Sequence, residues 1–166
     1  LLHRAGIDTV VLERKTQDYV LQRVRAGVLE VGLVNQLKAA GVGERMEKQG
    51  IVHDGTVISY GDTQIRIDFA EHTNSTVLVY GQTEVTRDLY AARESMGGTI
   101  VYEVEDVQIH DADGDTPHVT YRTHGTEHQL DCDYIAGCDG FHGVSRQTIP
   151  KEARREFEKV YPFGWL

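Results

Sequence analysis

Residues 130–147 read LDCDYIAGCDGFHGVSRQ and join an apolar segment to a glycine-containing turn. At the two-residue period of a β-strand, alternate residues from Cys132 to Cys138 share one face, while Ile135 and Gly137 share the other. Both faces therefore tolerate burial. The pattern predicts a central, buried strand.

The predicted strand ends abruptly at Asp139-Gly140, and Gly143 precedes a short polar helix predicted over 144–147. Such a junction presents an acid, backbone N–H groups and a helix N-terminus at the carboxyl end of a strand. Ligands of α/β sheets bind at this edge. We therefore expect a cofactor at this corner.

The composition limits the kind of partner. The 166 residues carry 17 basic and 26 acidic side chains, a formal charge of -9, which argues against nucleic acid or an anionic membrane surface. No apolar run approaches the roughly 18 residues that a membrane span needs. We expect a small ligand and one domain, since no linker or repeat divides the chain.

Cys132 and Cys138 do not form a pattern for a disulfide or for zinc. On one strand they would lie about 20 Å apart, too far for a disulfide. We expect reduced, buried thiols and a cytoplasmic protein. The eight histidines show no metal-ligand spacing, and no G-x-S-x-G elbow supports a hydrolase.

The start of the chain predicts the end of a helix, closed by Gly6, and then a buried strand over 9–13 that ends in Glu13. An acid at the end of the second strand of a dinucleotide-binding unit accepts hydrogen bonds from ribose hydroxyls. The glycine-rich turn expected about twenty residues earlier is absent. We therefore expect an internal piece of a longer protein, truncated at both ends.

A basic cluster follows this strand: Arg14, Lys15, Arg23 and Arg25 stand against one acid, Asp18. In an acidic chain such an excess indicates either an anionic ligand, such as a pyrophosphate, or a solvated loop. Composition alone favours neither.

The rest of the chain alternates helical and extended patterns. Helices are predicted over 28–40, 44–49 and 83–96, with Thr83 as an N-cap of the third. Strands are predicted over 52–60, 64–69, 76–80, 99–108, 118–123 and 127–130, with turns at 61–63, 113–114 and 124–125. Together they predict an α/β nucleotide-binding domain with an inserted small sheet and a β-meander.

Five stretches resemble the FAD-dependent aromatic hydroxylases, the class A flavoprotein monooxygenases. They are AGIDTVVLER (5–14), RVRAGVLE (23–30), VYGQTEVTRDL (79–89), DCDYIAGCDGFHGVSRQ (131–147) and VYPFGWL (160–166). The resemblance implies a partial FAD/NAD(P)-binding Rossmann-like domain over 1–166. It also implies that the N-terminal G-x-G-x-x-G strand and the C-terminal substrate domain lie outside the chain, and that a crossing into that domain begins at about residue 155.

The same resemblance implies cofactor contacts. Glu13 would hold the adenosine ribose of FAD, and Arg25 and Gln82, with Arg23 as a neighbouring candidate, would reach its pyrophosphate and ribityl region. Asp139 and Gly140 would bind the ribityl-phosphate portion. The residues expected beside the isoalloxazine ring are Ala26, Gly27 and Val28.

Further residues are implied for NADPH. Phe141, His142 and Arg146 would contact the pyridine nucleotide, although Phe141 can equally be a core residue and Arg146 can cap a helix or pair with an acid. The segment with Arg14, Lys15 and Tyr19 would face the NADPH 2′-phosphate, whose charge two cations would favour.

The activity implied is NADPH-dependent, oxygen-consuming hydroxylation of a small phenol, with 4-hydroxybenzoate as the expected substrate and 3,4-dihydroxybenzoate as the product. The full-length protein is expected to be a homodimer. No catalytic or metal-binding residue is expected within the chain. Two alternatives stay open: a related hydroxylase for another phenol, and an isolated piece that holds no cofactor.

Overall fold

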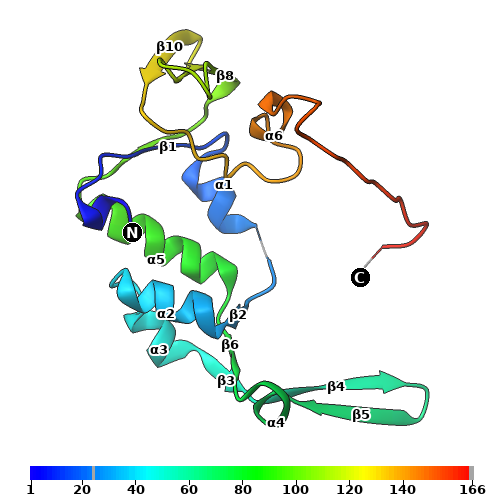
Figure 1. The fold of residues 1–166 in the computed structure, drawn as a ribbon. Helices are drawn as coiled ribbons and strands as arrows, with labels where there is room; N and C mark the ends of the chain where they lie inside the picture. The colour runs from blue at the N-terminus through cyan, green and yellow to red at the C-terminus, as the bar shows by residue number, and fades with distance from the viewer. Residues whose placement is uncertain (24, 165–166) are drawn as a thin grey trace. The chain divides into compact units, whose positions relative to one another are not determined.

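The computed structural model describes residues 1–23 and 25–164, which form two compact units, Leu1–Glu103 and Val104–Leu166 (Figure 1). No glycine- or proline-rich stretch marks the boundary between the two units at Glu103. Within the described residues, the helices are a short 3-10 helix His3–Ala5, α1 Gln17–Gln22, α2 Val31–Ala39, α3 Glu44–Gln49, α4 Phe69–Thr73, α5 Gln82–Ser95 and α6 Ser145–Thr148. The strands are β1 Val10–Leu12, β2 Val28–Glu30, β3 Ile51–His53, β4 Gly55–Tyr60, β5 Thr63–Asp68, β6 Val77–Val79, β7 Thr99–Val101, β8 Glu105–His110, β9 His118–Thr123 and β10 Thr126–Asp131.

In the first unit, β1 and β7 form a parallel pair with Val11 opposite Ile100. The predicted strand is confirmed, but its predicted burial is wrong, because the Val11 side chain is 44% exposed. A β-branched run favours extended backbone whether or not a second layer covers it. The preceding turn ends as predicted at Gly6, whose φ of 76° lies in the left-handed region.

A three-stranded sheet of order β2-β6-β3 supports the core of this unit. The core consists of Leu29, Leu37, Met46 and Tyr80, contributed by β2, α2, α3 and the residue after β6. The helix predicted from Val28 is therefore wrong over its first three residues, which pair with β6 instead. Helix α3 has the predicted bounds.

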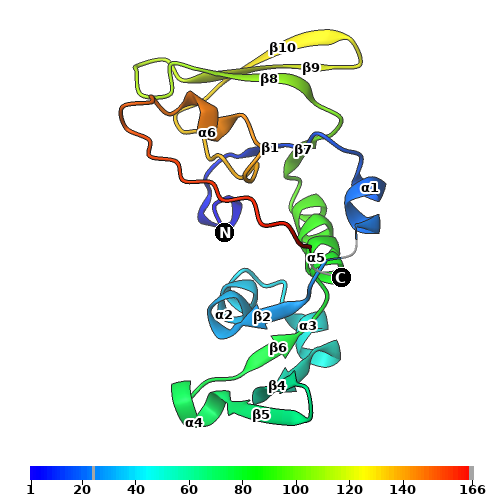
Figure 2. The same cartoon turned by 90° about the vertical axis from the view of Figure 1, so that its right-hand side faces the viewer.

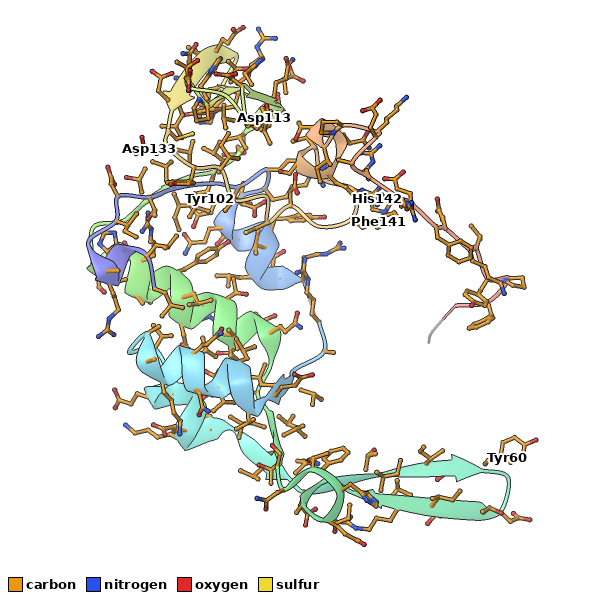
Figure 3. All side chains as sticks on the ribbon, viewed as in Figure 1. Tyr60, Tyr102, Asp113, Asp133, Phe141 and His142 are labelled. Carbon is orange, nitrogen blue, oxygen red and sulfur yellow. The ribbon has the colours of Figure 1, made fainter. Side chains whose placement is uncertain are left out.

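The β4–β5 hairpin projects from the three-stranded sheet, with Tyr60 at its tip (Figures 1 and 3). Its turn is at the predicted place, and Gly61 adopts the positive φ of 56° that such a turn requires. Helix α4 follows β5 and was not predicted; Asp68 caps it by accepting the Glu71 N–H at 3.0 Å.

Helix α5 is the longest described helix and begins after Gly81 (Figure 2). The predicted N-cap role of Thr83 is wrong, because Gly81 is the N-cap and Thr83 lies inside the first turn. The end of the helix at Gly97, with a φ of 72°, is as predicted. The Arg93 guanidinium joins the helix to β1 and β7 by donating to Thr9 Oγ1 at 2.7 Å and to the Thr99 carbonyl at 3.2 Å.

The second unit contains the predicted meander, an antiparallel sheet of order β10-β9-β8. The single strand predicted over 99–108 is divided, because β7 belongs to the parallel pair and β8 to the meander. The turn before β9 is closed by Asp111, which accepts the Thr116 N–H at 2.7 Å. The turn at 124–125 lies where it was predicted.

The central strand predicted over residues 132–138 is wrong. These residues form no strand, the Tyr134 side chain is 93% exposed, and Cys138 is exposed rather than buried. An apolar alternation makes a strand only where a neighbour completes the ladder of hydrogen bonds, and no described strand pairs with this segment. The helix predicted after it is confirmed as α6, displaced by one residue.

Candidate cofactor-binding site

Glu13 lies at the end of β1, as predicted. Its backbone N–H donates to the Val101 carbonyl at 2.8 Å, and its carboxylate accepts the Lys15 N–H at 2.8 Å. The edge-to-face pair Tyr90 and Tyr102 lies within electrostatic range of this carboxylate. Burial is the main reason that the pKa of Tyr90 is raised to about 12, and the charges of Tyr102 and Glu13 add to this shift. The Tyr90 hydroxyl therefore stays neutral.

The basic cluster is built around α1 rather than spread along a loop. Thr16 caps the helix by accepting the Tyr19 N–H at 3.1 Å, and the Tyr19 ring then lies under two cations. Lys15 Nζ is 5.2 Å and Arg23 Cζ is 5.6 Å from the ring centroid, and Arg23 also donates to the Tyr19 hydroxyl at 3.3 Å. Both cations and the neighbouring Arg14 are exposed, so they can meet an anion from solution.

The described residues of the 23–27 segment are held at both ends against the start of α5. Thr83 Oγ1 donates to the Arg23 carbonyl at 3.1 Å, and the Tyr80 N–H donates to the Gly27 carbonyl at 2.7 Å. A Cβ on Gly27 would come within 2.6 Å of Gly81 Cα, so the two backbones meet where only glycine fits. The structure thus brings the predicted residues Arg25, Ala26 and Gly27 to the start of α5.

This junction has the donors that a pyrophosphate needs. No side chain caps the N-terminus of α5, whose first residue is Gln82, and Arg25 supplies a cation on the adjacent segment. Backbone N–H groups at a helix N-terminus and a guanidinium both bind phosphate oxygens. The residues present therefore fit the diphosphate part of FAD.

An ionic network behind the junction was not found by sequence reasoning. Arg45 of α3 pairs with Glu84 and Asp88 of α5, and the Tyr80 hydroxyl donates to Asp88 Oδ2 at 2.7 Å. Burial and the hydrogen bond to Asp88 raise the pKa of Tyr80 to about 12. The spacing of Glu84 and Asp88, four residues apart on one helical face, was the signal available in the sequence.

In the second unit, Asp139 organises the predicted corner. Its Oδ2 accepts the Ser145 N–H at 2.9 Å, and this hydrogen bond is the main reason that the pKa of the carboxyl lies below its usual range. Gly140 has a φ of 72°, and a Cβ on Gly143 would collide with the Asp139 carboxylate. The carboxylate therefore holds the turn together, a structural role that the sequence did not indicate.

The residues after this corner cluster around one aromatic ring. Arg146 Cζ lies 4.0 Å from the centroid of the Phe141 ring, and the His142 ring packs edge-on against Phe141 with the two centroids 5.0 Å apart. Arg146 Nε lies 3.6 Å from Glu156 Oε1, so the alternative that this arginine pairs with an acid is observed. A pocket of about 240 Å³ is lined by Phe141, Arg146, Arg154, Arg155, Glu156, Phe157 and Glu158.

Other site types find no support among residues 1–23 and 25–164. No three of their histidine, cysteine, aspartate or glutamate side chains are grouped as metal ligands would be. None of the helices in this part of the chain is both long enough and apolar enough to cross a membrane. Both cysteines are free.

The chain belongs to the FAD binding domain family, which matches residues 1–166. An FAD-binding domain is expected to contain both helices and strands, as this chain does. The hydrogen-bond donors at the start of α5 and the close approach of Gly27 to Gly81 also agree with such a domain. The predicted α/β fold of an FAD-binding domain and the predicted cofactor FAD are thus confirmed.

Individual proteins are similar to this chain. The chain is 48% identical, over its whole length, to p-hydroxybenzoate hydroxylase of Acinetobacter baylyi (strain ATCC 33305 / BD413 / ADP1), and it spans 41% of that protein. The solved structure of BexE, from a study of oxidation during BE-7585A biosynthesis, is 26% identical with a TM-score of 0.69 over 84% of this chain and 28% of that one. The p-nitrophenol 4-monooxygenase PnpA from Pseudomonas putida DLL-E4 shares the fold, with 19% identity and a TM-score of 0.63 over 78% of this chain and 34% of that one.

Proposed function

We propose that the chain is the FAD-binding part of an NADPH-dependent flavin monooxygenase that hydroxylates 4-hydroxybenzoate to 3,4-dihydroxybenzoate. The observation that carries this proposal is the 48% identity over the whole chain to p-hydroxybenzoate hydroxylase. Because the chain spans 41% of that relative, the substrate and the complete activity belong to the longer polypeptide that we expect to carry these residues. We further propose that this polypeptide is a cytoplasmic homodimer.

The first unit would hold most of FAD. Glu13, fixed at the end of β1, would accept hydrogen bonds from the adenosine ribose. Arg25, with Arg23 as a neighbour, and Gln82 at the start of α5 would bind the pyrophosphate and ribityl region. The segment 26–28 would pass the isoalloxazine ring, where Gly27 leaves no side chain between it and Gly81.

The second unit would contribute the corner formed by Asp139 and Gly140. Since Asp139 Oδ2 already accepts the Ser145 N–H, we propose that the ribityl-phosphate portion meets the exposed backbone of Gly140 and the remaining carboxylate oxygen. The flavin, when bound, supplies the redox and oxygen chemistry, and these residues orient and shield it.

NADPH would be bound by two groups of residues. Lys15, Arg14 and the ring of Tyr19 would hold the 2′-phosphate, because a phosphate of charge near -2 pairs with two exposed cations. Phe141, His142 and Arg146 would contact the rest of the pyridine nucleotide. Replacing Lys15 by Gln should then lower the preference for NADPH over NADH without changing the product.

The test is an assay of the purified full-length protein with 4-hydroxybenzoate, NADPH and oxygen. Chromatography should detect 3,4-dihydroxybenzoate, and NADPH oxidation should accelerate when the phenol is added. A protein that oxidises NADPH at the same rate with and without 4-hydroxybenzoate would contradict the proposed substrate. A panel of phenols, p-nitrophenol included, then separates the proposal from a related hydroxylase.

The cofactor-free alternative applies to the 166 residues alone. Titrating the isolated chain with FAD and following flavin fluorescence distinguishes the two cases. Stoichiometric quenching shows that the described donors suffice for binding, and unquenched fluorescence shows that residues outside the chain are needed.

A further inference from the structure

We propose that Thr83 is a positioning residue for FAD: its hydroxyl holds the backbone of Arg23, and with it Arg25 two residues later, at the start of α5. The inference rests on the proposed function, because it takes Arg25 to bind the cofactor's pyrophosphate. It adds a residue that touches the segment rather than the ligand.

The hydrogen bond of Thr83 leaves its own helix. Its Oγ1 donates to the carbonyl of Arg23, sixty residues away in sequence, at 3.1 Å. Thr86, one turn further along α5, bonds instead to the Gln82 carbonyl of the same helix at 2.9 Å. A threonine hydroxyl inside a helix ordinarily donates to a carbonyl one turn earlier in the same helix, as Thr86 does. The contact of Thr83 with Arg23 is instead a tertiary contact.

Thr83 supplies one of two anchors of the segment. The other is backbone, the Tyr80 N–H donating to the Gly27 carbonyl at 2.7 Å, and the close approach of Gly27 to Gly81 reinforces it. The backbone anchor is independent of the side chains, whereas the anchor beside Arg23 depends on the Thr83 hydroxyl. Removing that hydroxyl frees the Arg23 end of the segment, two residues from Arg25, and leaves the backbone anchor at Gly27.

An anchored segment binds more tightly than a free one. The conformational entropy of the residues that carry Arg25 is then lost on folding and not on binding. Arg25 is also a cation next to the positive end of a helix, which repels it when no anion is present. The Thr83 anchor therefore opposes this repulsion by holding the backbone at Arg23, two residues before Arg25.

The test compares Thr83→Val, Thr83→Ser and Thr86→Val in the full-length protein. FAD dissociation constants are measured on the apoprotein by quenching of flavin fluorescence, and unfolding midpoints are measured on the same samples. Thr83→Val removes one hydrogen bond and should raise the FAD dissociation constant about 3- to 10-fold. Thr83→Ser should restore it to within about twofold, and Thr86→Val, the same change on the same helix, should leave it within about twofold.

A double-mutant cycle with Arg25→Gln tests whether Thr83 affects FAD affinity through Arg25. If Thr83 acts through Arg25, Thr83→Val should change FAD affinity less than about twofold in the Arg25→Gln background. Equal effects of Thr83→Val and Thr86→Val, or a Thr83→Val effect that is undiminished without Arg25, would overturn the proposal. Because the readout is FAD binding, a protein that binds FAD but does not hydroxylate 4-hydroxybenzoate refutes the proposed substrate and leaves this inference standing.

Discussion

The hydroxyl of Tyr80 offers the sharpest test of the packing behind the site. The ring lies in the core of the first unit with 4% of its surface exposed, and its hydroxyl donates to Asp88 Oδ2 at 2.7 Å. Tyr80→Phe removes the oxygen and leaves the ring, so no cavity of consequence forms. Asp88 keeps its ion pair with Arg45, so no buried carboxylate loses all its partners.

The expected cost is therefore that of one hydrogen bond to a charged acceptor. Such bonds contribute about 1.5–3 kcal/mol, and the remaining Arg45 contact places this one near the lower end, at about 1.5–2 kcal/mol. With a urea dependence of about 1–3 kcal/mol per molar, the unfolding midpoint should fall by about 1 M.

The assay is urea unfolding of the chain, followed by circular dichroism at the helical band. Helices α2, α3 and α5 all belong to the first unit, so this signal reports mainly on the part that contains Tyr80. Tyr60→Phe is the matched control, because Tyr60 is 88% exposed and the same change there should alter stability by less than about 0.5 kcal/mol. Equal midpoints for the two variants, with equal urea dependence, would refute the argument that the Asp88 bond stabilises the unit.

Three further predictions concern the same chain. Gly27→Ala should destabilise the chain by about 1–3 kcal/mol, because the new Cβ would lie 2.6 Å from Gly81 Cα. Gly32→Ala is the control: its Cβ would meet nothing within 4 Å inside α2, so the change should stabilise the chain by about 0.5–1 kcal/mol. The urea unfolding midpoints of the two variants should therefore move in opposite directions. Burial raises the pKa of Tyr80 from 10.0 to about 12, so the hydroxyl contributes fully to the free energy of unfolding below pH 10 and loses this contribution as the pH rises toward 12. The free energy of unfolding should therefore fall across this range, and it should fall less steeply in Tyr80→Phe. Asp139→Ala should weaken the turn before α6 by about 1 kcal/mol, because the Ser145 N–H loses its acceptor. Asp139→Asn keeps an acceptor oxygen. Hydrogen exchange of the Ser145 amide should therefore be faster in Asp139→Ala and nearly as slow in Asp139→Asn as in the parent.

Features that depend on local chemistry could be predicted from the sequence. Helix α3 has the predicted bounds, and Gly6, Gly61 and Gly97 end their elements with the positive φ that a glycine at each place predicted. In each case the residue itself restricts the backbone, so no distant partner is needed. The position of Glu13 at the end of a strand could be predicted because the β-branched residues before it favour extended backbone.

Features that depend on a distant partner could not be predicted. Residues 28–30 carry a helical pattern but form β2, because β6 offers a ladder some fifty residues later. Residues 132–138 carry a strand pattern but form no strand, because no described strand pairs with them. The contacts of Thr83 with Arg23 and of Arg45 with α5 join residues far apart in sequence; the spacing of Glu84 and Asp88 indicates an acidic face on the helix but not which cation meets it.

The junction at the start of α5 and the corner at Asp139 are stabilised by different kinds of contact, and this difference predicts how each responds to mutation. The junction at the start of α5 depends on tertiary contacts, namely the hydroxyl of Thr83, the approach of Gly27 to Gly81 and the network behind Tyr80. Changes there alter the stability of the first unit and the placement of the cofactor donors together. The corner at Asp139 depends on one local hydrogen bond to Ser145, so a change there alters the turn and leaves the meander intact. Stability and FAD affinity should therefore change together for substitutions around α5 and independently for substitutions around α6.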